Sequence, residues 1–93
     1  MNIGKALKFC RCAKDLSLET VAERAGISVS YLSRIENQKR EPALSLVGKI
    51  AEAVAVPVPI VVFLASEEGE LKGLDKKAAK QFSDLALDLI RRS

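Results

Sequence analysis

The sequence predicts an all-α protein, and three observations support this fold class. Apolar residues make up 48% of the 93 residues but aromatic residues only 4%, so Leu, Ile, Val and Ala must supply the core, which suits packed helices. Apolar residues recur at helical spacing in several separate stretches, bounded by serine or glycine. Because a chain this short builds one small core, we expect one domain, residues 1–65, followed by a linker and helix in residues 66–93.

Two helices are predicted near the N-terminus. The first covers residues 3–14, where apolar residues lie on one stripe and lysines lie off it. Ser17 is a good cap for the second, which keeps the helical period over residues 18–25. Gly26 ends this helix because glycine tolerates a positive φ.

The third and fourth helices flank a polar loop. Ser28 caps the third helix, which runs to about Glu36, and residues 37–42 form the loop. The fourth helix has Leu44 as the first of its core-facing residues. Gly48 inside it costs about 1 kcal/mol relative to Ala, so either packing compensates or a neighbouring backbone approaches closely there.

The most apolar stretch lies at residues 53–65. It is thirteen residues long and contains Pro57 and Pro59, whereas a membrane span needs roughly 20 residues, so we expect no membrane anchor. We predict a short fifth helix over residues 60–65, apolar on more than one face, which another surface must cover. A last amphipathic helix, capped by Asp75, must dock on its own domain or on a second subunit.

Positive charge is concentrated in the first part of the chain. Residues 1–65 contain nine Lys and Arg against six Asp and Glu, whereas residues 66–93 contain six of each. The formal net charge of +3 therefore belongs to residues 1–65, which favours a cationic face that binds nucleic acid. Ordinary solvation of the surface is the alternative explanation for this charge.

The residue types argue against catalysis and metal binding. Histidine is absent, which removes the commonest acid–base side chain and the commonest zinc-binding nitrogen. Cys10 and Cys12 are two residues apart, so on a helix they point about 200° apart and cannot pair with each other. We therefore expect no enzyme, no metal and no cofactor, and unbridged cysteines favour a cytoplasmic location. Early charged residues indicate no signal peptide.

Residues 18–37 contain the pattern of a helix-turn-helix. In this motif the first helix rests across the DNA backbone and the second enters the major groove. The pattern consists of a small residue where the helices cross, a glycine at the turn and a shared apolar core: Ala22, Gly26, Ile27, Leu32 and Ile35.

Three segments carry a family resemblance over residues 3–65: "LSLETVAERAGIS", "SYLSRIENQKREP" and "LSLVGKIAEAV". In them the sequence resembles the XRE family of bacterial and phage repressors, the Cro and lambda-repressor type. The resemblance implies a five-helix lambda-repressor-like helix-turn-helix domain whose third helix reads bases, here with an additional C-terminal helix. It also implies a dimer on a near-palindromic operator.

The resemblance places the base-reading positions on Ser28, Val29, Ser30 and Arg34, with Ser33 nearby. Arg34 is the strongest candidate, because its guanidinium can grip O6 and N7 of a guanine, a contact worth about 1–3 kcal/mol of discrimination. Val29 suits contact with a thymine methyl group. For Arg34 a solvated charge or an intramolecular ion pair is the alternative.

The resemblance also implies contacts to the phosphate backbone. Asn37, Lys39 and Arg40 follow the reading helix where the family's loop lies along the phosphates, and Ser17 matches another phosphate-binding position. Such contacts fix the register of a protein on DNA without reading sequence. Leu18 stands where the family usually has Gln, so one amide that touches phosphate is missing.

Other matching positions are structural. Arg11 and Glu36 correspond to a partly buried salt bridge between the first and third helices of several family members. Gln38 and Ala55 replace common glycines, and Ala43 replaces a capping Ser or Thr. With Arg34 the only large polar group at the reading positions, DNA shape is expected to carry part of the specificity.

We therefore expect a transcriptional regulator, a repressor or autoregulator, that binds double-stranded DNA as a homodimer. The alternative is a protein-interaction module of the same fold, an antitoxin or coactivator-like adaptor with a second protein as its partner. Dimerisation or docking would use the apolar segment, the final helix or both: Ile60, Phe63, Leu64, Phe82, Leu85 and Leu89.

Overall fold

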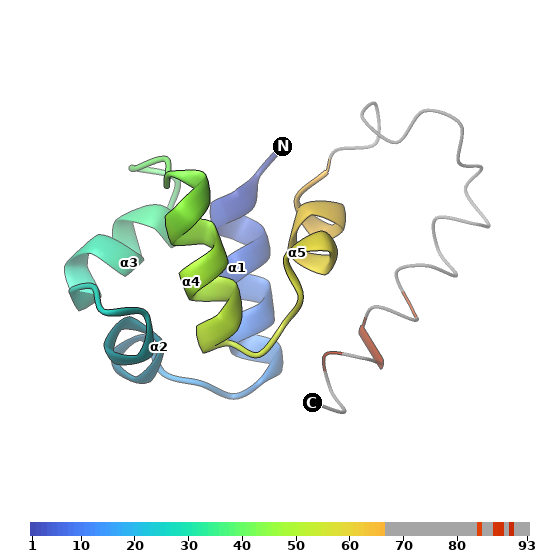
Figure 1. Ribbon diagram of the computed structural model, residues 1–93, viewed down its shortest axis with the longest axis horizontal. Coiled ribbons are helices and arrows are strands. Elements are labelled where there is room, and N and C mark those ends of the chain that lie inside the picture. The colour runs from blue at the N-terminus through green and yellow to red at the C-terminus, as the bar shows by residue number, and fades with distance from the viewer. Residues whose placement is uncertain (67–83, 85–86, 89, 91–93) are drawn as a thin grey trace.

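Five α-helices build the domain, in agreement with the predicted all-α class (Figure 1). The computed structural model describes residues 1–66 together with Asp84, Leu87, Asp88 and Ile90. The helices are α1 (Ile3–Ala13), α2 (Leu18–Ala25), α3 (Val29–Glu36), α4 (Leu44–Ala53) and α5 (Val58–Ala65).

The helices lie so that α2 and α3 occupy one end of the domain and α5 the other, with α1 and α4 between them (Figure 1). Helix α1 packs against α3 on one side and α5 on the other, and α2 packs against both α3 and α4. The two ends therefore share the same central pair of helices.

Local signals explain where α2 and α3 begin. The Ser17 hydroxyl accepts a hydrogen bond from the Thr20 N–H at 3.1 Å, and the Ser28 hydroxyl accepts one from the Tyr31 N–H at 3.0 Å. Each bond satisfies a backbone N–H that a helix start otherwise leaves without a partner. Gly26 ends α2 at φ 72°, the left-handed conformation expected for it.

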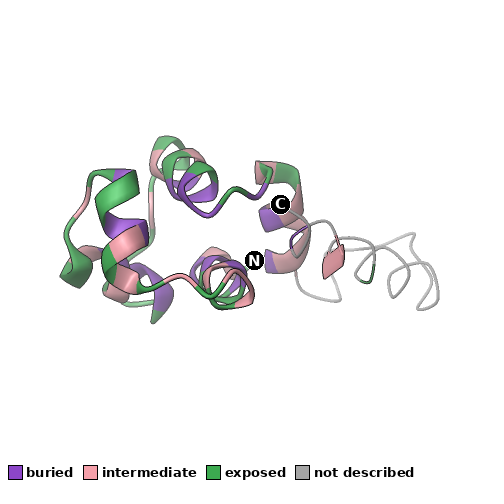
Figure 2. Cartoon of the chain, turned by 90° about the horizontal axis from the view of Figure 1, so that it is seen from below, coloured by how far each residue is buried: buried purple, intermediate pink, exposed green. Residues whose placement is uncertain are grey.

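One apolar core joins all five helices. Figure 2 shows the buried residues on the sides of the helices that face one another. Leu7 and Cys10 come from α1, Leu32 and Ile35 from α3, and Ile50 from α4, each with at most 1% of its surface exposed. The rest of the buried cluster consists of Ala6, Val21, Ala22, Ala25, Ala51, Ala53, Val54, Val56, Val61, Ala65 and Ile90.

Two sequence-based expectations were wrong, and one of the two explanations offered for Gly48 is excluded. Leu44 is 80% exposed, because it is the first residue of α4 and lies where the chain leaves the loop, before the helix meets the core. Of the two explanations for Gly48, the close approach of a neighbouring backbone is excluded, since a Cβ added there meets no atom within 4 Å. Helix α5 begins at Val58 rather than Ile60, because Pro59 fits in the first turn, where its missing N–H is not needed.

The close backbone approach is instead at Gly4. A Cβ added there would overlap the carbonyl oxygen of Ile35, so only glycine lets α1 and α3 come this close. Nothing in the sequence pattern singled out this glycine. It fixes how near the third helix lies to the centre of the domain.

Within the described residues, no single helix is long and apolar enough to cross a membrane. Helices α4 and α5 reach the required length and composition only when joined, and they are bent by 108° relative to each other. Both contribute buried residues to the core, among them Ile50 and Val61.

Candidate nucleic-acid interface

Helix α3 has one side in the core and the other in solvent. Leu32 and Ile35 are fully buried, whereas Ser30 and Arg34 are exposed and Val29 is 38% exposed. Val29 belongs neither to the core cluster nor to the partly buried apolar residues packed against that cluster. The outward side of α3 is therefore free to contact a ligand.

An ion pair fixes α3 against α1. The Arg11 Nε and one further guanidinium nitrogen donate to the two oxygens of the Glu36 carboxylate at 2.8 and 2.9 Å. A third hydrogen bond, 2.8 Å long, runs from Arg11 to the carbonyl oxygen of Leu16. The side chain of Glu36 is 3% exposed, so this two-pronged pair is shielded from water. The pair expected from the resemblance is thus present.

The ion pair also settles the protonation of Arg11. The hydrogen bond that Arg11 donates to the Glu36 carboxylate is the main influence, and it raises the pKa of Arg11 above its already high usual value despite partial burial. The guanidinium therefore stays charged throughout the working pH range. Since Glu36 is neutralised by Arg11, the charges left exposed on and after α3 are mainly Arg34, Lys39 and Arg40.

Some of the predicted DNA-contacting groups already make bonds within the protein. Ser17 and Ser28 cap their helices, and the Ser17 hydroxyl lies 2.9 Å from the Thr20 hydroxyl. The Ser17 hydroxyl donates its hydrogen to the Thr20 hydroxyl, whereas the Ser28 hydroxyl, which accepts from Tyr31, keeps a hydrogen that it can donate to a ligand. The half-buried Ser33 receives a 3.3 Å bond from the amide of Asn37.

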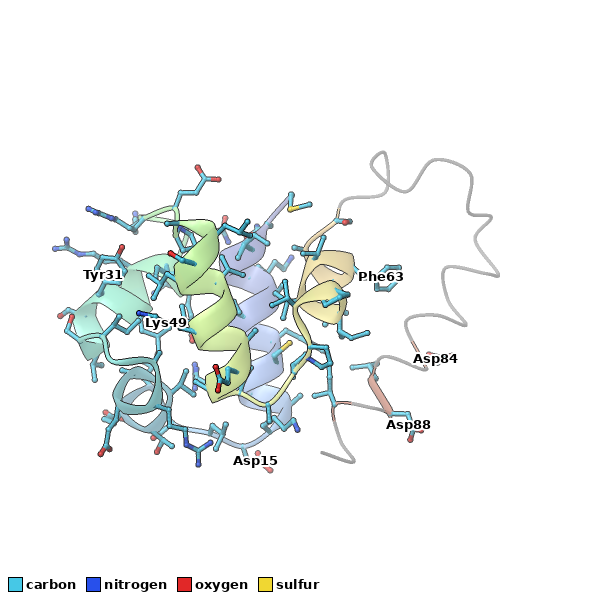
Figure 3. The ribbon with its side chains drawn as sticks, viewed as in Figure 1. Asp15, Tyr31, Lys49, Phe63, Asp84 and Asp88 are labelled. Atoms are coloured by element: carbon cyan, nitrogen blue, oxygen red, sulfur yellow. The ribbon has the colours of Figure 1, made fainter. Side chains whose placement is uncertain are left out.

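The loop after α3 is held by side-chain contacts that the sequence did not reveal. The Asn37 amide donates to the Ser33 carbonyl oxygen at 2.9 Å and so closes the end of α3. The guanidinium of Arg40 lies 5.3 Å from the ring centre of Tyr31, within the range of a cation–π contact. Figure 3 shows Tyr31 at the α3 end of the domain. Lys39 is exposed.

Gln38 takes the strained conformation that glycine usually adopts after this helix, with φ 63°. Ala55 does the same after α4, with φ 58°. The two replaced glycines therefore have a structural cost, because a Cβ disfavours the left-handed region. Helix α4 has no side-chain cap, as expected from Ala43 at its start.

The residues predicted for dimerisation or docking are only partly described. Ile60, Phe63 and Leu64 of α5 are half-buried. Leu64 lines a hollow of about 280 Å³ together with Phe9 of α1 and others. Phe82, Leu85 and Leu89 lie outside the described residues. Ile90, which was not part of the predicted apolar stripe, is buried in the core cluster.

The two cysteines differ in environment. Cys10 is buried, and its removal from water raises the pKa of the thiol to about 11, an effect that the charge of Lys14 opposes. Cys12 is exposed, and neither is in a disulfide. Among the described residues, no three His, Cys, Asp or Glu side chains are close enough together to hold a metal ion.

One further contact could not be predicted from the sequence. Arg24 donates a 3.2 Å hydrogen bond to the carbonyl oxygen of Ala53 and so ties α2 to α4. This contact and the Arg40–Tyr31 pair join residues of different segments, α2 with α4 and α3 with the loop that follows it, so the periodicity within one helix does not indicate them. The position of Arg24 in the last turn of α2 was the only sign in the sequence of its contact with α4.

Comparison with known proteins gives a family match. The sequence profile of the family described as Helix-turn-helix matches residues 7–61, which run from within α1 through α2, α3 and α4 to the first half of α5. No solved structure matches this chain.

Several curated proteins are similar over most of the chain. The immunity repressor protein of Bacillus phage phi105 is 30% identical over 96% of this chain and 65% of its own length. The HTH-type transcriptional regulator SinR of Bacillus licheniformis is 30% identical over 88% of this chain and 89% of its own length. The transcriptional regulator ClgR of Mycobacterium tuberculosis is 32% identical over 70% of this chain and 58% of its own length. The chain thus spans less than two thirds of the phage repressor and of ClgR.

Proposed function

This chain belongs to the XRE-type helix-turn-helix family, a family of transcriptional regulators and not of enzymes, and we propose from that membership that it binds specific double-stranded DNA sequences. Its role is that of a transcriptional repressor or autoregulator. It acts as a homodimer on a near-palindromic operator, with α3 of each subunit in a major groove.

The observation that supports this proposal most directly is the outward side of α3. Ser28, Val29, Ser30 and Arg34 are exposed together, while the opposite side of the same helix is buried. A helix needs a free edge of this kind to reach base pairs in the major groove. Arg34 is the group on this edge that can recognise a guanine through two hydrogen bonds.

The charges around α3 support the same function. Lys39 and Arg40 are exposed in the loop that follows Arg34, and Glu36 is paired with Arg11. The exposed carboxylate nearest in sequence is Glu41. Excess positive charge beside a reading helix attracts the phosphate backbone, so binding should weaken steeply as salt is raised.

Dimerisation sets the geometry of the operator. Two copies related by a two-fold axis place their α3 helices about 34 Å apart, one turn of DNA, which requires an inverted repeat with that spacing. The α5 residues Ile60, Phe63 and Leu64 supply the contact between the copies. These residues are apolar and half-buried in the single chain.

Selection of bound duplexes from a random pool tests the function. Wild-type protein should enrich an inverted repeat and bind it roughly 10³ times more tightly than unrelated DNA. Arg34→Ala should enrich a related repeat in which one base pair per half-site is no longer specified. Lys49→Ala is the matched control, since it removes an exposed positive charge of α4 that lies beside Glu23 and Glu52.

The control should return the wild-type repeat. If the wild-type protein enriches no sequence and binds all duplexes equally weakly, the DNA-binding proposal is wrong. The alternative of a protein-interaction module of the same fold would then be favoured.

A further inference from the structure

Helix α5 is unusual in having no polar side chain. Its sequence is VPIVVFLA, so no face of the helix suits water. A helix that is apolar all round has to be covered all round. Helices α1 and α4 cover one side, where Val61 and Ala65 are buried, and Ile60 and Phe63 remain half-buried.

One described residue near the C-terminus, Ile90, belongs to the core that α5 helps to form. Ile90 is 1% exposed and belongs to the cluster to which α5 contributes Val61 and Ala65. Leu87, one helical turn earlier, is half-buried, and Asp84, one further turn back, is exposed. The described residues of this segment are helical, so burial increases along one side toward Ile90.

The position of the segment leaves the DNA-binding side open. Figure 3 shows Asp84 and Asp88 beyond α5, at the end of the domain opposite to Tyr31 of α3. Ile90 is buried within a single chain, without any contribution from a second copy. Its own chain therefore already occupies a site in the core that a partner subunit would otherwise have to fill.

We propose that the C-terminal segment, anchored by Ile90, docks on the α5 end of its own domain and thereby competes with a second copy for the apolar surface of α5. The proposal rests on the dimer of the proposed function and adds its regulation. With Ile90 docked in the core, the chain is a monomer. With the segment released, Ile60, Phe63 and Leu64 become available to another chain.

The docking can be measured on the wild-type protein by NMR. Nuclear Overhauser effects between the Ile90 methyl groups and core methyl groups such as those of Val61 are expected within one chain. In a sample that mixes isotope-labelled and unlabelled chains, the same effects between different chains should be absent at low protein concentration. Effects found only between chains, or none at all, would overturn the proposal.

The competition is measured by sedimentation equilibrium without DNA. Ile90→Asp places a charge where the core is apolar and so releases the segment. The dimer dissociation constant should then fall by about tenfold or more, because every chain is in the released state that can dimerise. Asp84→Asn, at an exposed position of the same segment, should stay within about twofold of wild type. An unchanged or higher dissociation constant for Ile90→Asp contradicts the competition.

Two features keep the test decisive. If circular dichroism shows that Ile90→Asp does not fold, the milder Leu87→Ala takes its place in the sedimentation measurement. The NMR measurement uses wild-type protein and does not depend on either variant. Neither experiment contains DNA, so a failure of sequence-specific DNA binding would show in the duplex selection and not here.

Discussion

The two ends of the domain are held together in different ways. At the α1–α3 junction, formed by Gly4, Arg11, Ile35 and Glu36, the contacts are directional: a two-pronged ion pair with bonds of 2.8 and 2.9 Å and a backbone approach that only glycine permits. At the α5 end, the side-chain contacts are apolar, and a backbone hydrogen bond of 2.8 Å from the Asn2 N–H to the Ala65 carbonyl oxygen joins the end of α5 to the start of α1. The α1–α3 junction therefore depends mainly on directional side-chain contacts, and the α5 end mainly on the burial of apolar side chains.

This difference matches the different tasks proposed for the ends. A helix that reads base pairs must be held at a defined height and angle, since misplacement by about 1 Å is enough to lose a well-formed contact. An apolar surface that exchanges one covering segment for another needs only to be apolar and of suitable shape. Directional contacts are non-interchangeable, whereas apolar contacts tolerate a change of partner.

Breaking the ion pair should have the largest effect. Glu36→Ala leaves the guanidinium of Arg11 partly buried without its partner, and we expect a loss of about 3–5 kcal/mol in the free energy of unfolding. Chemical denaturation measures it. Glu41→Ala, which removes an exposed carboxylate from the neighbouring loop, should change stability by no more than about 0.5 kcal/mol. Equal costs for the two variants would show that the junction is not fixed by this pair.

A pair of glycine substitutions tests the backbone approach. Gly4→Ala forces α3 away from α1, which should cost about 1–3 kcal/mol and weaken DNA binding. Gly48→Ala adds the same methyl group inside α4, where nothing lies within 4 Å, and should stabilise the protein by about 0.5–1 kcal/mol. Thermal unfolding of both variants gives the comparison. A stabilising Gly4→Ala would contradict the close approach.

Cys10 lies on α1, the helix that both ends share. Because burial raises the pKa of its thiol to about 11 from the ordinary 9.0, the unfolded chain loses this proton first as the pH rises. Stability should therefore be unaffected below pH 9 and fall between pH 9 and 11, by about 1 kcal/mol at pH 10. Denaturation at pH 8 and pH 10 measures the loss of stability between the two pH values. This loss should be smaller in Cys10→Ala than in the wild-type protein, and unchanged in Cys12→Ala.

A substitution at the joint between α4 and α5 should change stability least, and it should raise rather than lower the free energy of unfolding. Ala55 has a positive φ of 58°, so Ala55→Gly relieves strain and is expected to stabilise the protein by about 0.5–1 kcal/mol. Ala53→Gly, two residues earlier and still within α4, should destabilise it because glycine weakens a helix. Calorimetry of the two variants distinguishes them, and a destabilising Ala55→Gly would contradict the strain.

The features that the sequence predicted are those with local causes. Ser17 and Ser28 cap their helices through N–H groups three residues away, and Gly26 ends α2 through its own φ. Such signals lie within a few residues and can be recognised from spacing alone. The exposed position of Arg34 likewise follows from helical periodicity once Leu32 and Ile35 are assigned to the core.

The features that the sequence did not predict depend on contacts between distant segments. The role of Gly4 depends on the carbonyl of Ile35, and the burial of Ile90 depends on a core formed by residues before 66. Leu44 has the spacing of a core residue but lies in the first turn of α4, beyond the neighbouring helices. Periodicity indicates which side of a helix is apolar, but not where along its length that side is covered.

The reading of bases by the outward side of α3 is tested most directly by measuring binding to two duplexes that differ at a single base pair of the selected site. Wild-type protein should prefer the guanine-containing duplex by about 1–3 kcal/mol, and Arg34→Ala should bind the two duplexes equally. If wild-type protein shows no preference at any position of the site, or if Arg34→Ala keeps the full preference at every one, Arg34 on α3 does not read the DNA sequence.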